Sequence, residues 1–222
     1  PVHTVVCSDE ETAHVRIYLE PDPGICPMQS GRCPNPVRYP LDQILMMNHL
    51  APRGGLIVHA AGATVGGCAL AFPGISGGGK STLSRLFIAA GLGDTLLSDD
   101  RVIMRVTQEP EESARVTAWG TPWPGDARVA RNTGAPLAAL LFLTKAQENK
   151  VMPLEASSAM KRLMPVVSCP SYDRARSDQV LATCARVVES LPCFELHFRP
   201  EAHLVVMLTE RSWSPGAKEA VR

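Results

Sequence analysis

The sequence carries no excess of charge of either sign, because its 22 lysines and arginines balance its 22 aspartates and glutamates. It also contains no block of consecutive basic residues. A chain without a net positive field or a basic patch lacks the electrostatic attraction that recruits nucleic acids and anionic membranes. We therefore expect no nucleic acid and no membrane as partner, and binding chemistry that depends on local sites.

The seven cysteines include no pair at the CxxC spacing. Their odd number and scattered positions are typical of reduced thiols and predict a cytoplasmic protein. Cys26 and Cys33 share a proline-rich stretch, but no second pair completes a zinc site there. The first residues also lack a basic region followed by an apolar one, so no secretory signal is expected in them.

Charged residues are absent between positions 54 and 79, which could suggest a membrane span. However, His59 and several glycines interrupt this stretch, and Gly66 and Gly67 are typical of a turn between two strands. The pattern therefore predicts two buried strands, at 56–63 and 68–72, in place of a transmembrane helix.

The length of 222 residues suits one α/β domain with a small N-terminal addition. We expect two strands, a proline-rich loop and a short helix in residues 1–53, the main domain in 54–210, and a tail in 211–222. Prolines and glycines predict an irregular loop at 119–126. Further strands are predicted at 95–97, 101–106, 138–143 and 193–198, and helices at 41–49, 83–90, 155–164, 173–190 and 200–208.

What the sequence does contain is a complete G-x-x-x-x-G-K-[ST] phosphate-binding loop at residues 74–81, between a predicted strand and a predicted helix. Glycines lack the Cβ atoms that would keep consecutive N–H groups from converging on a polyphosphate. Lys80 supplies charge to the β- and γ-phosphates, and the Ser81 hydroxyl is a ligand for Mg²⁺. The alternative is a glycine-rich turn without nucleotide. The motif predicts ATP and Mg²⁺ as cofactors, with the nucleotide held by Gly74, Ile75, Ser76, Gly77, Gly78, Gly79, Lys80, Ser81 and Thr82.

Two acids, Asp99 and Asp100, follow the next predicted strand about twenty positions after Lys80. In P-loop enzymes an acid after an apolar strand holds the Mg²⁺ that accompanies the nucleotide. The short spacing predicts that the strand before the acids lies close to the strand of the phosphate loop. Either acid could instead cap the turn that follows. His59, within a predicted strand, could bind a phosphate oxygen, orient an aspartate or be an ordinary core residue.

The strand with His59, the phosphate loop and the run Leu97-Ser98-Asp99-Asp100 together resemble the catalytic domain of HPr kinase/phosphorylase and its related kinases, over about residues 54–208. The Gly-Thr-Pro-Trp segment at 120–123 resembles the related proteins that lack the usual N-terminal domain. The resemblance implies an α/β fold shared with phosphoenolpyruvate carboxykinase, a P-loop mixed sheet with flanking helices. The chain has no counterpart of the glycine-rich signature of full HPr kinases, so the resemblance does not extend to phosphorolysis or to HPr as substrate.

By the same resemblance, one carboxylate contacts hydrated Mg²⁺ and the other is the base for the incoming hydroxyl. We assign Asp99, with Ser81, to the metal and Asp100 to the base. Arg128 and Arg131 follow the irregular loop and could clamp the transferred phosphate, or could be solvated surface residues. Trp119 and Trp123 could line an acceptor or adenine pocket, or pack the loop onto the core.

These residues and the resemblance predict an ATP- and Mg²⁺-dependent kinase that phosphorylates a hydroxyl, on Ser or Thr of a protein or peptide or on a small alcohol such as serine. A homo-oligomer is left open. One alternative is an ATP-binding regulator that transfers no phosphate. The second carboxylate argues against it, because pure binding needs only one. A carboxykinase-like enzyme is a third possibility, disfavoured by the short chain and by the lack of an ordered Lys/His/Asp set for a second metal.

Overall fold

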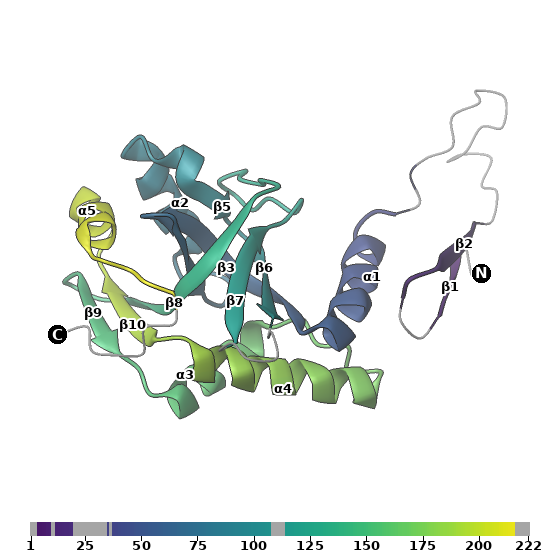
Figure 1. Cartoon of the computed structure of the whole chain (residues 1–222). Helices are drawn as coiled ribbons and strands as arrows, with labels where there is room; N and C mark the ends of the chain where they lie inside the picture. The colour runs from purple at the N-terminus through teal and green to yellow at the C-terminus, as the bar shows by residue number, and fades with distance from the viewer. Residues whose placement is uncertain (1–3, 10–11, 20–34, 36, 108–113, 216–222) are drawn as a thin grey trace, which may run out of the picture.

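The structure is a computed structural model that describes residues 4–9, 12–19, 35, 37–107 and 114–215. The stretch that holds Cys26 and Cys33 and the acidic segment 108–113 lie outside this part. The described chain is a mixed α/β structure with a central, mostly antiparallel sheet and flanking helices (Figure 1). The predicted α/β class is confirmed at this level.

Two strands near the N-terminus form a hairpin of their own. As predicted, β1 (Thr4–Ser8) and β2 (Val15–Leu19) pair antiparallel, and they have no strand partner in the main sheet among the described residues. Figure 1 shows this hairpin beside α1 and apart from the main sheet. The strand that precedes the phosphate-loop motif belongs to the other, larger sheet.

Eight strands of the described chain make up the main sheet, paired in the order β4-β3-β6-β7-β8-β10-β9 with β5 beside β3. Among these pairings, β8 with β4 and β8 with β10 are parallel, and the others are antiparallel. The strands are β3 (Gly55–Val65), β4 (Cys68–Pro73), β5 (Leu96–Ser98), β6 (Arg101–Thr107), β7 (Arg115–Gly120), β8 (Gly134–Lys145), β9 (Lys150–Pro153) and β10 (Cys193–Phe198).

Two long strands, β3 and β8, change partner along their length. Residues 55–59 of β3 pair with β6, whereas residues 60–65 pair with β4. β8 pairs with β7 up to Pro136 and with β4 from Leu137 onward. Together with the pairing of β6 and β7, these contacts close a ring of strands. His59 lies at the change of partner, and its carbonyl oxygen accepts a hydrogen bond of 3.2 Å from the N–H group of Gly74, directly after β4.

The sequence did not predict β7 and β9, and it placed the start of β8 too late. β7 includes Trp119 and Gly120, which were assigned to the irregular loop, although Val116 and Ala118 alternate with exposed neighbours as in a half-buried strand. β8 begins at Gly134 and includes Pro136, which lies where the pairing of β8 passes from β7 to β4. A missing N–H group is tolerated at such a changeover.

The helices pack against the sheet in two groups. α3 and α4 contribute side chains to one core cluster, and α2 and α5 to the other. α4 begins after Asp173, whose carboxylate accepts a hydrogen bond of 3.1 Å from the N–H group of Arg176. The helices are α1 (Leu41–Leu50), α2 (Lys80–Ala89), α3 (Ala156–Leu163), α4 (Arg174–Ser190) and α5 (Ala202–Glu210), with short 3₁₀ turns at Ala51–Arg53, Gly93–Thr95 and Met164–Val166.

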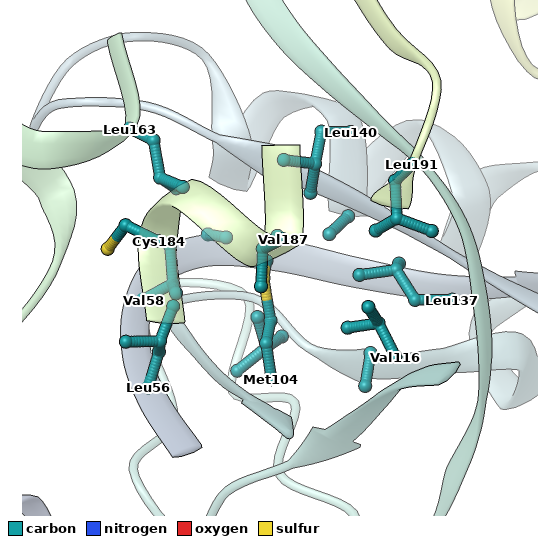
Figure 2. Packing of buried hydrophobic residues seen from close by; sticks show 14 of the residues in the cluster. Leu56, Val58, Met104, Val116, Leu137, Leu140, Leu163, Cys184, Val187 and Leu191 are labelled. Carbon is teal, nitrogen blue, oxygen red and sulfur yellow. The ribbon is translucent and has the colours of Figure 1, made fainter. Parts of the chain in front are cut away.

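The buried face of α4 carries an apolar stripe of Val180, Cys184, Val187 and Val188. Figure 2 shows Cys184 and Val187 of α4 beside Val58 of β3 and Met104 of β6. All four side chains are fully buried. Burying such apolar side chains contributes about 1.5–3 kcal/mol each, so the contact between α4 and the strands is a major source of stability.

The uncharged stretch before the phosphate loop forms the hairpin of β3 and β4, as predicted. Gly66 and Gly67 make its turn, with φ of +58° and +82°. None of the described helices is both long enough and apolar enough to cross a bilayer.

Glu195 of β10 connects three elements of the fold. Its Oε1 atom accepts hydrogen bonds from Thr144 Oγ1 of β8 (2.7 Å) and from Arg162 Nη2 of α3 (2.6 Å), and its Oε2 atom lies 3.2 Å from His197 Nε2. The bond from Thr144, followed by that from Arg162, lowers the pKa of Glu195 from 4.5 to about 2. The folded protein therefore stabilises the ionised form of Glu195 relative to the unfolded chain.

We expect Glu195→Gln to lower the free energy of unfolding at neutral pH and to remove part of its pH dependence. A depressed carboxyl pKa stabilises the fold above the ordinary value of 4.5, and this contribution is lost as the pH falls toward about 2. Urea denaturation at pH values across this window measures the effect. Glu201→Gln is the matched control, because Glu201 is 48% exposed in its pair with Arg199. If the free energy of unfolding depends on pH in the same way in wild type and in Glu195→Gln, the lowered pKa of Glu195 does not stabilise the fold.

Candidate functional site

A cleft of about 470 Å³ lies where β4, β8 and β10 end. β4 and β10 each pair in parallel with β8, so the carboxyl ends of all three strands lie at one edge of the sheet. Ligands of open α/β sheets bind at such an edge. The cleft is lined by His59, Ser76, Gly77, Gly79, Lys80, Ser81, Thr82, Arg85, Asp100, Gly125, Asp126, Lys145, Ala146, Phe198 and Pro200.

The phosphate-loop motif has the predicted context of strand, loop and helix. β4 ends at Pro73, and α2 begins at Lys80. Gly79 has φ of +107°, and a Cβ atom there would lie 2.2 Å from the Phe198 ring, so only glycine fits. The N–H groups of the first turn of α2 have no carbonyl partner one turn earlier in the helix. They form an anion-binding end that opens into the cleft.

Lys80 is folded over the phosphate loop. Its side chain is 6% exposed, and its Nζ atom donates hydrogen bonds to the carbonyl oxygens of Gly74 (2.8 Å) and Ile75 (2.9 Å). Burial lowers the pKa of Lys80, while the negative charge of Asp100 acts in the opposite direction. The ammonium group is thus held within the phosphate loop, where the sequence predicts that it compensates phosphate charge.

Asp100 stands in the cleft between two basic side chains. Its Oδ1 atom lies 3.0 Å from His59 Nε2, and its Oδ2 atom accepts a hydrogen bond from Arg101 Nη1. The hydrogen bond with His59 is the main cause that lowers the pKa of Asp100, and the charge of Arg101 adds to it against the effect of burial. The structure therefore brings His59, Asp100 and Lys80 together, as the sequence predicted.

The strand that precedes the acid pair does not adjoin the strand of the phosphate loop. β5 pairs with β3 at Gly62 and Ala63, and β3 lies between β5 and β4. The acids nevertheless come close to the loop, because the backbone of Asp100 accepts a hydrogen bond of 3.0 Å from the N–H group of Ala60, next to His59.

Asp99 is placed differently from the metal ligand that we expected. It is 1% exposed and is not among the residues that line the cleft. Its Oδ1 atom accepts hydrogen bonds from the backbone N–H groups of Gly125 (2.8 Å) and Val129 (3.1 Å), and its Oδ2 atom from that of Ala127 (2.6 Å). Both oxygens are therefore engaged by the loop at 121–131, and the acid that faces the cleft is Asp100.

Arg128 and Arg131 also lie outside the lining of the cleft. Arg131 Nη2 is 2.5 Å from Asp94 Oδ1, in a pair in which Asp94 is 95% exposed. Arg128 is exposed and has φ of +58°. A phosphate in the cleft is thus not clamped by either guanidinium in this arrangement.

The cations that do line the cleft, besides Lys80, are Arg85 and Lys145. The sequence offered a signal for Arg85, which is four positions after Ser81 and hence on the same face of α2. It offered none for Lys145, whose place depends on the parallel pairing of β8 with β4. Both are exposed, and neither has a hydrogen bond or ion pair within the described residues.

Neither Trp119 nor Trp123 lines the cleft. Trp123 donates a hydrogen bond of 2.7 Å from Nε1 to Asp42 Oδ2 at the start of α1. Of the two roles considered for these residues, packing of the loop therefore fits Trp123.

The described residues contain no group of three or more His, Cys, Asp or Glu side chains arranged to hold a metal ion. A magnesium ion that arrives with a nucleotide needs few protein ligands, because phosphate oxygens and water complete its shell. Ser81 and Asp100 are among the oxygen-bearing side chains of the cleft lining that fit this requirement.

No model of a known protein family matches this chain, and no curated protein matches it either. What the cleft binds therefore has to be inferred from its own residues.

Proposed function

We propose that the protein is an ATP- and Mg²⁺-dependent kinase that phosphorylates a hydroxyl group, on Ser or Thr of a protein or peptide or on a small alcohol such as serine. The observation that carries this proposal is the presence of a phosphate loop and a carboxylate in one cleft, with His59 Nε2 at 3.0 Å from Asp100 Oδ1. In pure ATP binding a carboxylate serves at most the metal, whereas transfer to a hydroxyl also needs a group that receives its proton.

The geometry divides the work among few groups. The N–H groups at the start of α2 and the ammonium of Lys80 hold phosphate oxygens, and the Ser81 hydroxyl is the ligand for Mg²⁺. The metal neutralises charge on the phosphates when the nucleotide is bound. Arg85 and Lys145 add positive charge on the walls of the same cleft.

Asp100 orients the incoming hydroxyl and accepts its proton. Its pKa is lowered, mainly by the hydrogen bond with His59, so the carboxylate is ionised at neutral pH. A weak base is sufficient here, because the transition state of phosphoryl transfer is loose and depends chiefly on positioning and charge stabilisation. His59 and Arg101 each engage one oxygen of Asp100 and thereby fix its orientation.

We infer further that the mixed sheet is of the type shared by HPr kinase and phosphoenolpyruvate carboxykinase, and that the protein acts in the cytoplasm. The support for the fold is the order of features along the chain: a strand with His59, the phosphate loop at the end of β4, and an acid pair after β5. The support for the compartment is that the described cysteines are free thiols, as is usual in reducing compartments.

Labelling with γ-³²P-ATP and Mg²⁺ tests the function. The purified protein is incubated with a lysate, or with free serine, and the labelled species is identified. We expect label on a hydroxyl of a protein or small molecule, and none with Lys80→Ala. Tight ATP binding without any labelled acceptor would favour the ATP-binding regulator, a role for which the ion pair of Asp100 with Arg101 would be a purely structural contact.

We expect Arg85→Ala and Lys145→Ala each to weaken ATP binding by about 3- to 30-fold, because a charged hydrogen bond to phosphate is lost. The loss should shrink at high salt, since both side chains are exposed. Calorimetry at two salt concentrations measures it. Arg131→Ala is the control, because its partner Asp94 lies outside the cleft lining. A larger loss for Arg131→Ala than for Arg85→Ala would restore the phosphate clamp first expected from the sequence.

A further inference from the structure

Residues 121–131, which we call the wall loop, form one side of the cleft through Gly125 and Asp126. The loop contains no helix or strand. Its shape therefore has to come from bonds to neighbouring elements, and the centre of those bonds is Asp99. The backbone N–H groups of residues 125, 127 and 129 all point at this one carboxylate, at 2.6–3.1 Å.

The burial of Asp99 makes these bonds decisive. The side chain is 1% exposed and has no ion pair within the described residues, so the three N–H groups are what compensates its charge. Conversely, three backbone donors of the wall loop would be left without this acceptor if the carboxylate were absent. The acid and the loop therefore depend on each other.

Two further contacts attach the ends of the wall loop to β6 and β5. Thr121 Oγ1 donates to the carbonyl oxygen of Arg101 at 2.8 Å, and the N–H group of Arg131 donates to that of Leu97 at 3.1 Å. At Gly125 the loop comes so near that a Cβ atom would lie 2.9 Å from Asp99 Oδ2 and 3.0 Å from Asp100 Cβ. The wall loop thus rests directly on both acids.

We propose that Asp99 is a positioning residue that holds the wall loop against Asp100, and that it is not a ligand of Mg²⁺. The two adjacent acids point in different directions. Asp100 lines the cleft, whereas Asp99 points to the wall loop and fixes the position of that loop. The consequence for phosphate transfer rests on the proposed function: the wall beside Asp100 determines where an acceptor hydroxyl can approach. The structural part, the dependence of the loop on Asp99, holds for any ligand of the cleft.

Amide hydrogen exchange in the protein without nucleotide or metal tests the structural part. In Asp99→Asn the side-chain amide presents a donor to a backbone donor, and we expect exchange at residues 125, 127 and 129 to become about 10- to 100-fold faster. Asp94→Asn, which removes only the exposed pair with Arg131, should leave these rates unchanged. Wild-type exchange rates at the three amides of Asp99→Asn would overturn the proposal.

Gly125→Ala gives an independent test that keeps the carboxylate and does not rely on the folding of Asp99→Asn. The added methyl group meets Asp99 Oδ2 and should speed exchange at the same three amides. Unchanged protection in Gly125→Ala would likewise contradict the proposal.

The Mg²⁺ requirement separates positioning from metal binding. At a fixed, sub-saturating ATP concentration, we expect the Mg²⁺ concentration for half-maximal ATP binding to stay within about twofold of wild type in Asp99→Asn, while turnover falls. An increase of about tenfold would make Asp99 a metal ligand and overturn the proposal. If wild type transfers no phosphate, the kinase proposal fails alone, because exchange and Mg²⁺-dependent binding still decide the role of Asp99.

Discussion

Lys80→Met should lose ATP affinity by about 10²- to 10³-fold while it keeps its fold, because the positive charge that the proposed site offers to the phosphates disappears. The structure makes methionine the better replacement than alanine. The Lys80 side chain is 6% exposed, so its apolar stem is packed and would leave a gap if it were truncated. Methionine retains that packing and removes the ammonium group, with its charge and its hydrogen bonds to Gly74 and Ile75.

Calorimetry with ATP and Mg²⁺ measures the loss, and thermal unfolding without nucleotide checks the fold. Lys145→Met is the matched control, since Lys145 lines the same cleft but is exposed and outside the phosphate loop. An equal loss in the two variants would mean that only general charge matters. If Lys80→Met binds ATP as tightly as wild type, the phosphate loop is not a nucleotide site.

The lowered pKa of Lys80 adds a pH signature to the same experiment. Because burial disfavours the charged form, Lys80 loses its proton at a lower pH than an ordinary lysine. ATP affinity of the wild type should therefore decline on the alkaline side as Lys80 loses its proton. Lys80→Met should lack this decline.

The sequence predicts the chemistry at the phosphate loop because all of its determinants are local. The glycines, Lys80 and Ser81 lie within one strand, one turn and the start of one helix. Arg85 follows the same logic by helix periodicity and was overlooked. Lys145 and Phe198 reach the cleft only through the parallel pairing of β8 with β4 and β10. Such pairings join residues far apart in the chain, and one sequence carries no local sign of them.

The roles of the acid pair show a second limit. Asp99 and Asp100 lie in the bend between β5 and β6, where the side-chain alternation of a strand does not determine which way each acid points. Which one faces the nucleotide depends on the register of β5 against β3, and the partner of the other is a loop that begins more than twenty residues later. The irregular shape of that loop was predictable from its prolines and glycines, but its attachment to Asp99 was not.

Asp100→Asn should transfer phosphate about 10²- to 10⁴-fold more slowly than wild type while ATP–Mg²⁺ binding stays near normal, as expected when a general base is removed. Asparagine keeps the size of the side chain and can still accept a hydrogen bond from Arg101, so the surrounding geometry is preserved. Single-turnover phosphate transfer and calorimetry separate rate from affinity. Asp94→Asn, far more exposed and outside the cleft lining, is the control for loss of a negative charge.

The pH dependence of transfer gives a finer test of the same residue. The hydrogen bond with His59 is the largest cause of the lowered pKa of Asp100, so His59→Ala should raise that pKa toward its ordinary value. Activity that requires the ionised carboxylate is lost as the pH falls through its pKa, and the acid limb of the rate profile should therefore move to higher pH in His59→Ala. An unmoved acid limb would mean that Asp100 is not the group that titrates. Transfer at the wild-type rate by Asp100→Asn would go further, because it would remove Asp100 from the role of general base.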